Sequence, residues 1–112
     1  MKRGEIWLVN LDPTIGSEIK KTRPAVIVSS DLVGILPLKV VVPLTEWKDR
    51  YVSAAWIVKI DPEERNGLSK TSAADALQIR SVSEQRLVKH LGTVTQFQVA
   101  QIVQAVLNVL QR

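Results

Sequence analysis

The sequence predicts a mainly β domain of the α+β class, in which a small, strongly curved sheet or barrel is closed by one C-terminal helix. Two observations lead to this prediction. Short β-branched runs alternate with turn residues at close spacing, and only the last segment has a sustained helical period. A chain of 112 residues forms one domain of ordinary size, so we expect a single domain over residues 1–112.

About five to seven short strands are expected. In the first, residues 3–9, Ile6 and Leu8 would lie on one face while Trp7 and Val9 lie on the other. The further strands are predicted at 24–29, 39–44, 53–60 and 73–79, and another one ends near His90, which we expect to be a surface or structural histidine.

The connection between the first two strands is long for a hairpin. Residues 12–17 (DPTIGS) carry strong turn signals, and the next strand begins only after Thr22. Loops of this length in small domains are usually functional or mobile. We therefore expect this loop to take part in function.

The C-terminal segment predicts an amphipathic helix. Thr95 and Gln98 have the spacing of a capping box, with Thr95 as the N-cap. A separate helical turn, capped by Ser83, is expected just before Leu87. The apolar face of the long helix would consist of Val99, Ile102, Val103, Val106 and Leu110, and Gln101, Gln104 and Asn108 would point away from it.

Composition narrows the classes of function. The chain has no cysteine and one histidine, and its carboxylates cluster only in the 61–64 turn, so we expect no metal site. No phosphate-cradling glycine loop or dinucleotide fingerprint is present, so we expect no cofactor. The absence of cysteine, of a signal-peptide pattern and of a long apolar run predicts a cytoplasmic protein without membrane contact.

The most informative stretch is residues 21–28 (KTRPAVIV). Proline after Arg23 favours extended backbone, and the apolar run beyond it predicts a buried strand that anchors the arginine. A guanidinium held at the mouth of a strand suits a phosphate group. The alternative is an ordinary surface arginine. The net charge of +4, with Lys20 and Lys21 beside Arg23, favours a polyanionic partner without requiring one.

The chain offers hydroxyl groups, arginines and scattered acids. These groups suffice for one metal-free reaction, the cleavage of RNA. RNA carries its own nucleophile, the 2′-hydroxyl, so an enzyme needs only to remove its proton, stabilise the phosphorane and protonate the leaving 5′-oxygen. DNA offers no such nucleophile. The inventory therefore favours RNA cleavage over DNA hydrolysis.

The order of motifs resembles the MazF/PemK toxins over nearly the whole chain. The amino-terminal signature is carried by residues 2–7, 10–18 and 22–28 (KRGEIW, NLDPTIGSE and TRPAVIV). The hydroxyl-bearing strand end of that family is matched by residues 40–45 (VVVPLT). Its carboxyl-terminal half is similar to residues 78–82 and 85–87 (QIRSV and QRL) and to the closing helix.

The resemblance implies an SH3-like barrel that acts as a homodimer and as the toxin of a type II toxin–antitoxin pair. Such proteins are endoribonucleases (mRNA interferases) that cut single-stranded RNA at short sequences without metal. The implied partners are mRNA, a second copy of the chain, and a cognate antitoxin whose acidic, flexible tail occupies the RNA groove. Operator DNA would be bound only through the antitoxin complex. Trp56 and the terminal helix are candidates for the dimer interface.

By the same resemblance, Arg23 would contact the scissile phosphate and Thr45 would place a hydroxyl on it. The residues implied in RNA binding are Gly16, Ser17 and Glu18 in the loop, with Lys20, Lys21, Ser72, Gln78 and Arg80. Thr45 has a simpler alternative role as the cap of the next turn.

Two positions depart from the family pattern. Residues 19–21 (IKK) stand where many members are glycine-rich, so the target sequence is expected to differ. Leu77 stands where an acidic residue often precedes the Gln-x-Arg block, so the general base is expected to be Glu18 or Asp75 instead. Two other functions stay open: a non-enzymatic, CcdB-like toxin that binds gyrase, and a catalytically silent nucleic-acid-binding module that acts in autoregulation.

Overall fold

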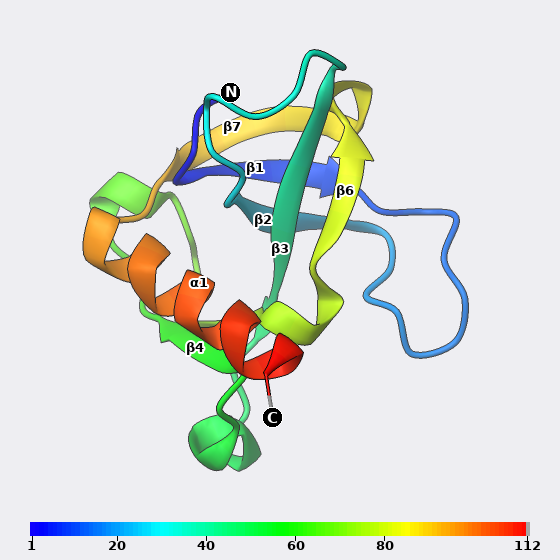
Figure 1. The fold of residues 1–112 in the computed structure, drawn as a ribbon. Coiled ribbons are helices and arrows are strands. Elements are labelled where there is room, and N and C mark those ends of the chain that lie inside the picture. Colours follow the sequence, from blue (N-terminus) through cyan, green and yellow to red (C-terminus); the bar gives the residue numbers. More distant parts are fainter. Residues whose placement is uncertain (112) are drawn as a thin grey trace.

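The computed structural model describes residues 1–111, which form one strongly curved antiparallel sheet and one α-helix (Figure 1). The strands of this part of the chain are β1 (Glu5–Asn10), β2 (Thr22–Ile27), β3 (Leu38–Glu46), β4 (Ile57–Ile60), β5 (Ser72–Asp75), β6 (Arg80–Ser83) and β7 (Leu87–Thr93). The helix α1 spans Gln96–Leu110, and the 3-10 turns are η1 (Asp49–Ser53), η2 (Glu64–Asn66), η3 (Ala76–Gln78) and η4 (Glu84–Arg86).

The long strand β3 joins two halves of the sheet. The strands are ordered β4-β5-β3-β2-β1-β7, and β6 pairs with β3 off this path. β3 pairs with β2 and β6 through its first residues and with β5 through Leu44, Thr45 and Glu46. In Figure 1, β3 runs the height of the molecule while β1 and β7 lie side by side behind it. The mainly β, α+β prediction is confirmed.

Three strands differ from the prediction. The predicted strand at 53–60 begins only at Ile57, because η1 and a turn from Ala54 occupy its first half. The predicted strand at 73–79 stops at Asp75, whose carboxylate accepts a hydrogen bond from the Leu77 amide and caps η3 (3.1 Å). β6 was not located from the sequence, because only Val82 of its four residues is buried.

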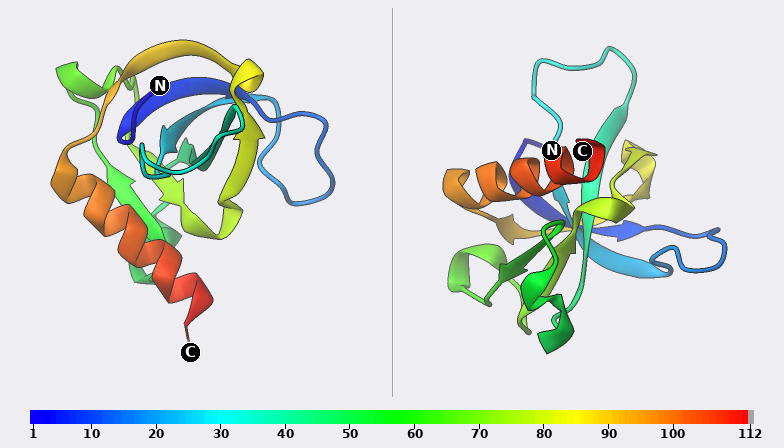
Figure 2. Two further views of the ribbon diagram at one scale, coloured as in Figure 1. Left: turned by 45° about the horizontal axis from the view of Figure 1, so that its top comes forward. Right: turned by 60° about the horizontal axis from the view of Figure 1, so that its bottom comes forward.

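The helix begins at the predicted cap. The Thr95 hydroxyl accepts from the Gln98 amide at 3.1 Å, and the Gln98 side chain accepts from the Thr95 amide at 2.9 Å. Ser83 caps η4 in the same manner, as predicted. Leu110 is the exception on the apolar face: its side chain is 74% exposed, because the last turn of α1 extends past the sheet (Figure 2). Within residues 1–111, no helix is both long and apolar enough to cross a membrane.

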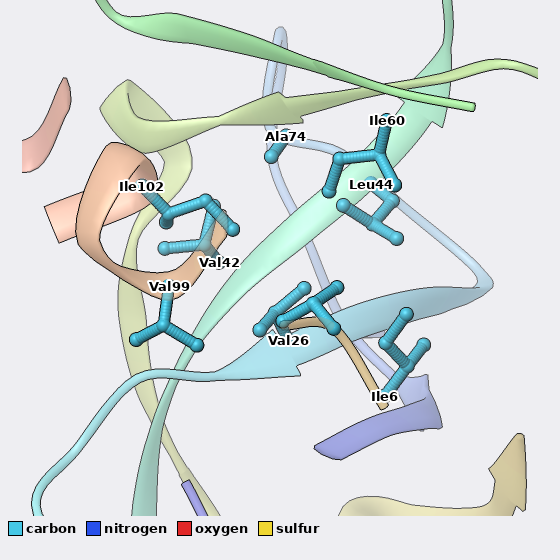
Figure 3. Packing of buried hydrophobic residues seen from close by; sticks show 9 residues of the cluster. Ile6, Val26, Val42, Leu44, Ile60, Ala74, Val99 and Ile102 are labelled. Atoms are coloured by element: carbon cyan, nitrogen blue, oxygen red, sulfur yellow. The ribbon is translucent and has the colours of Figure 1, made fainter. Parts of the chain in front are cut away.

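Two hydrophobic clusters fill the two sides of the curved sheet. The first packs Val99 and Ile102 of α1 against β2, β3 and β4 (Figure 3). The second lies between β1, β2, β3, β6 and β7, and Trp7 packs against it. Ile6 belongs to the first cluster and Val9 to the second, so the predicted alternation along β1 is confirmed. The clusters fix the ends of β2 and β3, which position the site described next.

Candidate functional site

A groove of about 400 Å³, here called the arginine groove, opens where β2 begins and β3 ends. It brings together three predicted site residues that are far apart in the sequence: Arg23, Thr45 and Ser72. The remaining lining residues are Leu8, Pro24, Leu44, Glu46, Gly67, Leu68, Ser69, Lys70 and Leu91.

Arg23 is held at the mouth of the β2 strand, as the sequence predicts. Pro24 is half-buried and the next residues, Ala25 to Ile27, are fully buried. The Arg23 Nε donates to the Lys20 carbonyl at 3.3 Å, while the Arg23 side chain stays exposed to solvent. The strand thus fixes the base of the side chain, and Arg23 lines the arginine groove.

Thr45 reaches the same groove through the register of the sheet. The last paired residues of β2 and β3 at this end are Ala25 and Pro43. If the same register is continued for two residues beyond this pair, Arg23 lies opposite Thr45. On its other side, β3 pairs Thr45 with Ala73 and Glu46 with Ser72. Thr45 and Arg23 therefore line one groove from neighbouring strands.

Sequence reasoning missed two charged residues of this groove, Glu46 and Lys70. Glu46 follows Thr45 directly, and Lys70 precedes Ser72 by two residues, so proximity to the predicted hydroxyls was the available signal. The Lys70 carbonyl accepts a hydrogen bond from the Ser72 hydroxyl at 3.1 Å. The arginine groove therefore contains two cations and one carboxylate, a charge balance that favours an anion.

A second groove of about 500 Å³, here called the loop groove, lies under the β1–β2 connection. It gathers four predicted RNA-binding residues: Ser17, Glu18, Gln78 and Arg80. Its other lining residues are Ile15, Ile19, Pro43, Leu77 and Ile79. The two grooves together contain seven of the predicted site residues, and Gly16, Lys20, Lys21 and Asp75 line neither.

Polar side chains of the loop groove are engaged with the loop backbone. Gln78 accepts from the Ile19 amide at 3.2 Å and donates to the Ser17 carbonyl at 3.1 Å. Arg80 donates to the Leu11 carbonyl at 3.0 Å. These contacts fix the loop that projects to the right of Figure 1.

The base of the same loop is held by a residue that the sequence did not single out. Arg86 donates to the carbonyls of Asn10 and Asp12, the first at 3.0 Å. Two arginines, Arg80 and Arg86, therefore bind backbone oxygens at the start of the loop. At its tip, Gly16 has φ +59° and open space around the position of a Cβ, so the glycine serves the turn conformation.

The two carboxylates predicted as general bases lie outside the arginine groove. Glu18 accepts from the Ile15 amide at 2.6 Å within the loop. Asp75 caps η3, and burial raises the pKa of its carboxyl above the ordinary value against the effect of its backbone hydrogen bonds. Lys20 and Lys21 are exposed on the loop, and Leu77, which replaces the expected acid, is also exposed.

The described part of the chain does not gather its histidine and carboxylates into a metal-binding group. Residues 1–111 contain no group of three that could hold a metal ion. His90 stacks on Trp7, with ring centroids 5.2 Å apart, and its Nε2 lies 4.0 Å from the Glu5 carboxylate. These contacts give His90 a structural environment at the surface of β1 and β7.

Comparison with known proteins gives a consistent result. Residues 2–110 match a family described as PemK-like, MazF-like toxin of type II toxin-antitoxin system. The chain is 36% identical to Endoribonuclease MazF9 of Mycobacterium tuberculosis, with 94% of this chain and 92% of that protein covered. It is 45% identical to Endoribonuclease PemK of Escherichia coli, with 54% of this chain and 47% of that protein covered.

Solved structures show the same fold at lower sequence identity. MazF from Deinococcus radiodurans superposes with a TM-score of 0.78 at 21% identity, covering 98% of this chain and 96% of the other. A mycobacterial endoribonuclease in complex with its cognate antitoxin gives a TM-score of 0.76 at 22% identity, covering 98% and 94%. These likenesses concern the fold.

Proposed function

The chain belongs to the PemK-like, MazF-like toxins of type II toxin–antitoxin systems, and we propose that it is a metal-independent, sequence-specific endoribonuclease that cleaves single-stranded RNA. The observation that carries this proposal is the meeting of Arg23 and Thr45 in one solvent-open groove. The names of the relatives support the reaction class, since MazF9 and PemK are both endoribonucleases.

The reaction is a transesterification within the RNA. The 2′-oxygen attacks the adjacent phosphorus, the bond from phosphorus to the 5′-oxygen breaks, and the products are a 2′,3′-cyclic phosphate and a 5′-hydroxyl. One proton leaves the 2′-hydroxyl and one is delivered to the 5′-oxygen. The Arg23 guanidinium stabilises the charge of the five-coordinate phosphorus, and the Thr45 hydroxyl donates to a phosphate oxygen.

The proton acceptor is a carboxylate that reaches the 2′-hydroxyl. Glu46 already lines the arginine groove. Glu18 and Asp75, the two candidates from the sequence, do not line it and would need the loop or η3 to move. Burial raises the pKa of Asp75 and so makes its carboxylate a stronger base than an ordinary one, which keeps Asp75 as a candidate.

Other predicted site residues act through the loop. Gly16, Ser17, Glu18, Lys20 and Lys21 lie on the segment that would cover bound RNA, and the two lysines add positive charge to it. Gln78 and Arg80 hold the loop backbone and are positioning residues in this scheme, and Ser72 lines the groove beside Lys70.

The proposed partners are a cognate antitoxin, whose acidic tail would compete with RNA for the arginine groove, and a second copy of the chain. Operator DNA would be bound through the antitoxin complex. Trp56, 43% exposed, and the terminal helix were the expected candidates for the dimer contact. The connection between β2 and β3 also exposes apolar side chains, with Leu32 at 96%, Ile35 at 104% and Leu36 at 68%, and is a further candidate.

The test is to incubate the purified protein with a long mixed RNA in EDTA and to map the new ends. We expect cleavage at one short sequence, with 5′-hydroxyl and 2′,3′-cyclic phosphate ends. Activity that requires added magnesium would refute the metal-free scheme. Intact RNA together with gyrase trapped on DNA would instead identify a CcdB-like toxin, and steeply salt-dependent RNA binding without cleavage would identify a silent binding module.

A further inference from the structure

Two aromatic rings and two cations form a cluster just beyond the end of β3. Trp47 and Tyr51 meet edge to face, with centroids 5.8 Å apart and an interplanar angle of 73°. Lys59 Nζ lies 5.2 Å from the Trp47 ring centroid, and the Arg50 guanidinium lies 5.4 Å from that of Tyr51. We call these four residues the Trp47 platform.

The platform adjoins the arginine groove through two of the strands that line it, β3 and β5. Trp47 lies two residues beyond Thr45 on the same chain segment. Its amide donates to the Thr71 carbonyl at 3.1 Å, and Thr71 precedes Ser72 of the groove. Figure 1 shows the turn η1, which carries Arg50 and Tyr51, projecting below β4 at the bottom of the molecule.

Core packing does not account for these rings. The two hydrophobic clusters of residues 1–111 are built without Trp47 or Tyr51. Both side chains are half-buried, and η1 contains no buried residue. The chain has only three tryptophans and one tyrosine, so two of its large rings lie together on a projecting, partly solvent-accessible turn.

Such an arrangement is suited to an unpaired nucleobase. Single-stranded nucleic acids bind by stacking bases on aromatic rings while cations accompany the backbone, and this contact tolerates any base because every base has a π-face. Lys59 lies over the Trp47 ring and Arg50 over the Tyr51 ring, so each ring of the platform has a cation beside it, held by cation–π attraction. Lys59 and Arg50 also supply charge for a neighbouring phosphate.

We propose that the Trp47 platform is a second RNA subsite, which stacks one unpaired base of a strand whose scissile phosphate lies in the arginine groove. This inference rests on the proposed endoribonuclease function for the position of the phosphate. The platform gives affinity and holds the strand in one direction along the groove. It takes no part in the chemical step.

The test measures binding and cleavage separately. Binding is followed with an RNA that carries a 2′-deoxy nucleotide at the mapped cleavage position, and abasic nucleotides are then placed one at a time on either side. The Trp47→Ala/Tyr51→Ala variant is compared with Trp47→Phe/Tyr51→Phe, which keeps two rings, and with Phe97→Ala, which removes an exposed ring on α1. Thermal midpoints verify that each variant folds.

We expect the double alanine variant to bind this RNA about tenfold more weakly or worse. One abasic position should weaken the parent by the same factor and leave the alanine variant unaffected. At saturating RNA the cleavage rate should stay within about threefold of the parent, since the chemical step is unchanged. The phenylalanine variant should retain most of the affinity, and Phe97→Ala should bind like the parent.

The subsite would be overturned if the parent and the double alanine variant bound the RNA with equal affinity. It would also be overturned if every abasic position weakened binding by the parent to the same extent. Should the alanine pair fail to fold, the two single variants Trp47→Ala and Tyr51→Ala are tested against the abasic series, and responses equal to that of the parent would overturn the subsite. If the parent binds RNA through Trp47 and Tyr51 but cleaves none, the subsite stands and the proposed endoribonuclease function fails.

Discussion

The two grooves contain similar polar side chains that differ in their hydrogen bonds and in their exposure to solvent. In the loop groove, Gln78 and Arg80 donate to backbone carbonyls of the loop, and Gln78 also accepts from it. In the arginine groove, Arg23 also donates to one backbone carbonyl, that of Lys20 three residues away, but Arg23 is exposed whereas Arg80 is half-buried, and Thr45 lines the same groove. A half-buried side chain that bonds to a distant loop holds that loop in position, whereas an exposed guanidinium at a groove is accessible to a substrate. This difference supports the proposal that the scissile phosphate binds in the arginine groove.

The largest expected effect comes from Arg23→Ala. Removing the guanidinium should lower the single-turnover cleavage rate by about 10²–10³-fold, because charge stabilisation of the transition state is lost. The free energy of unfolding should change by less than about 0.5 kcal/mol, because the side chain is exposed. Cleavage assays and chemical denaturation measure the two effects. Arg65→Ala, at an exposed surface ion pair, is the matched control.

If Arg23→Ala cut RNA as fast as Arg65→Ala, the arginine groove would lose its assignment. Arg23→Lys should recover part of the rate only, since an ammonium keeps the charge but lacks the planar fork.

A smaller loss is expected for Thr45→Val. This change keeps the shape of the side chain and removes one hydroxyl donor, so cleavage should slow by about tenfold or more. Thr22→Val, at an exposed position at the start of β2, provides the control for a generic loss of a hydroxyl. A Thr45→Val enzyme with the parent rate would leave Thr45 as a strand residue only.

Arg80→Met should affect stability more than the chemical step. The Leu11 carbonyl loses a charged donor, which costs about 1–3 kcal/mol, and the loop becomes looser. We expect urea denaturation to detect this loss, and the rate at saturating RNA to fall less than for Arg23→Ala. The opposite order of effects, with Arg80 dominating catalysis at unchanged stability, would exchange the roles of the two grooves.

The smallest effect concerns Asp75. Because burial raises the pKa of Asp75 in the fold, its contribution to stability is present below the unfolded pKa and is lost as pH rises through the folded pKa. Asp75→Asn should therefore stabilise by less than about 1 kcal/mol at pH 7, since solvent screens the half-exposed group. This advantage should shrink as the solution is made more acidic.

The same variant examines the general base. Melting curves between pH 3 and pH 7 follow its stability, and cleavage follows its chemistry. If Asp75→Asn abolishes cleavage while Glu46→Gln does not, η3 must move toward the arginine groove during the reaction.

Local sequence signals predicted the elements that depend on neighbouring residues. The capping box at Thr95, the turn capped by Ser83 and the buried run after Arg23 each depend on neighbours in sequence, and the structure has all three. Leu110 was misplaced, because its burial depends on where the sheet ends.

The loop groove could not be predicted in the same way. Arg80 and Gln78 look like any half-exposed strand residues, and their partners lie 69 and 59–61 positions away in the chain. Glu46 and Lys70 were missed because a single charged residue near a strand end is ordinary in sequence, and only the pairing of β3 with β5 brings them together.

The most direct test of the account is a crystal structure of the protein with a single-stranded RNA that carries a 2′-deoxy nucleotide at the mapped cleavage position. We predict that the scissile phosphate lies within hydrogen-bonding distance of the Arg23 guanidinium and the Thr45 hydroxyl. A phosphate bound instead against Arg80 in the loop groove, with the arginine groove empty of RNA, would contradict the account.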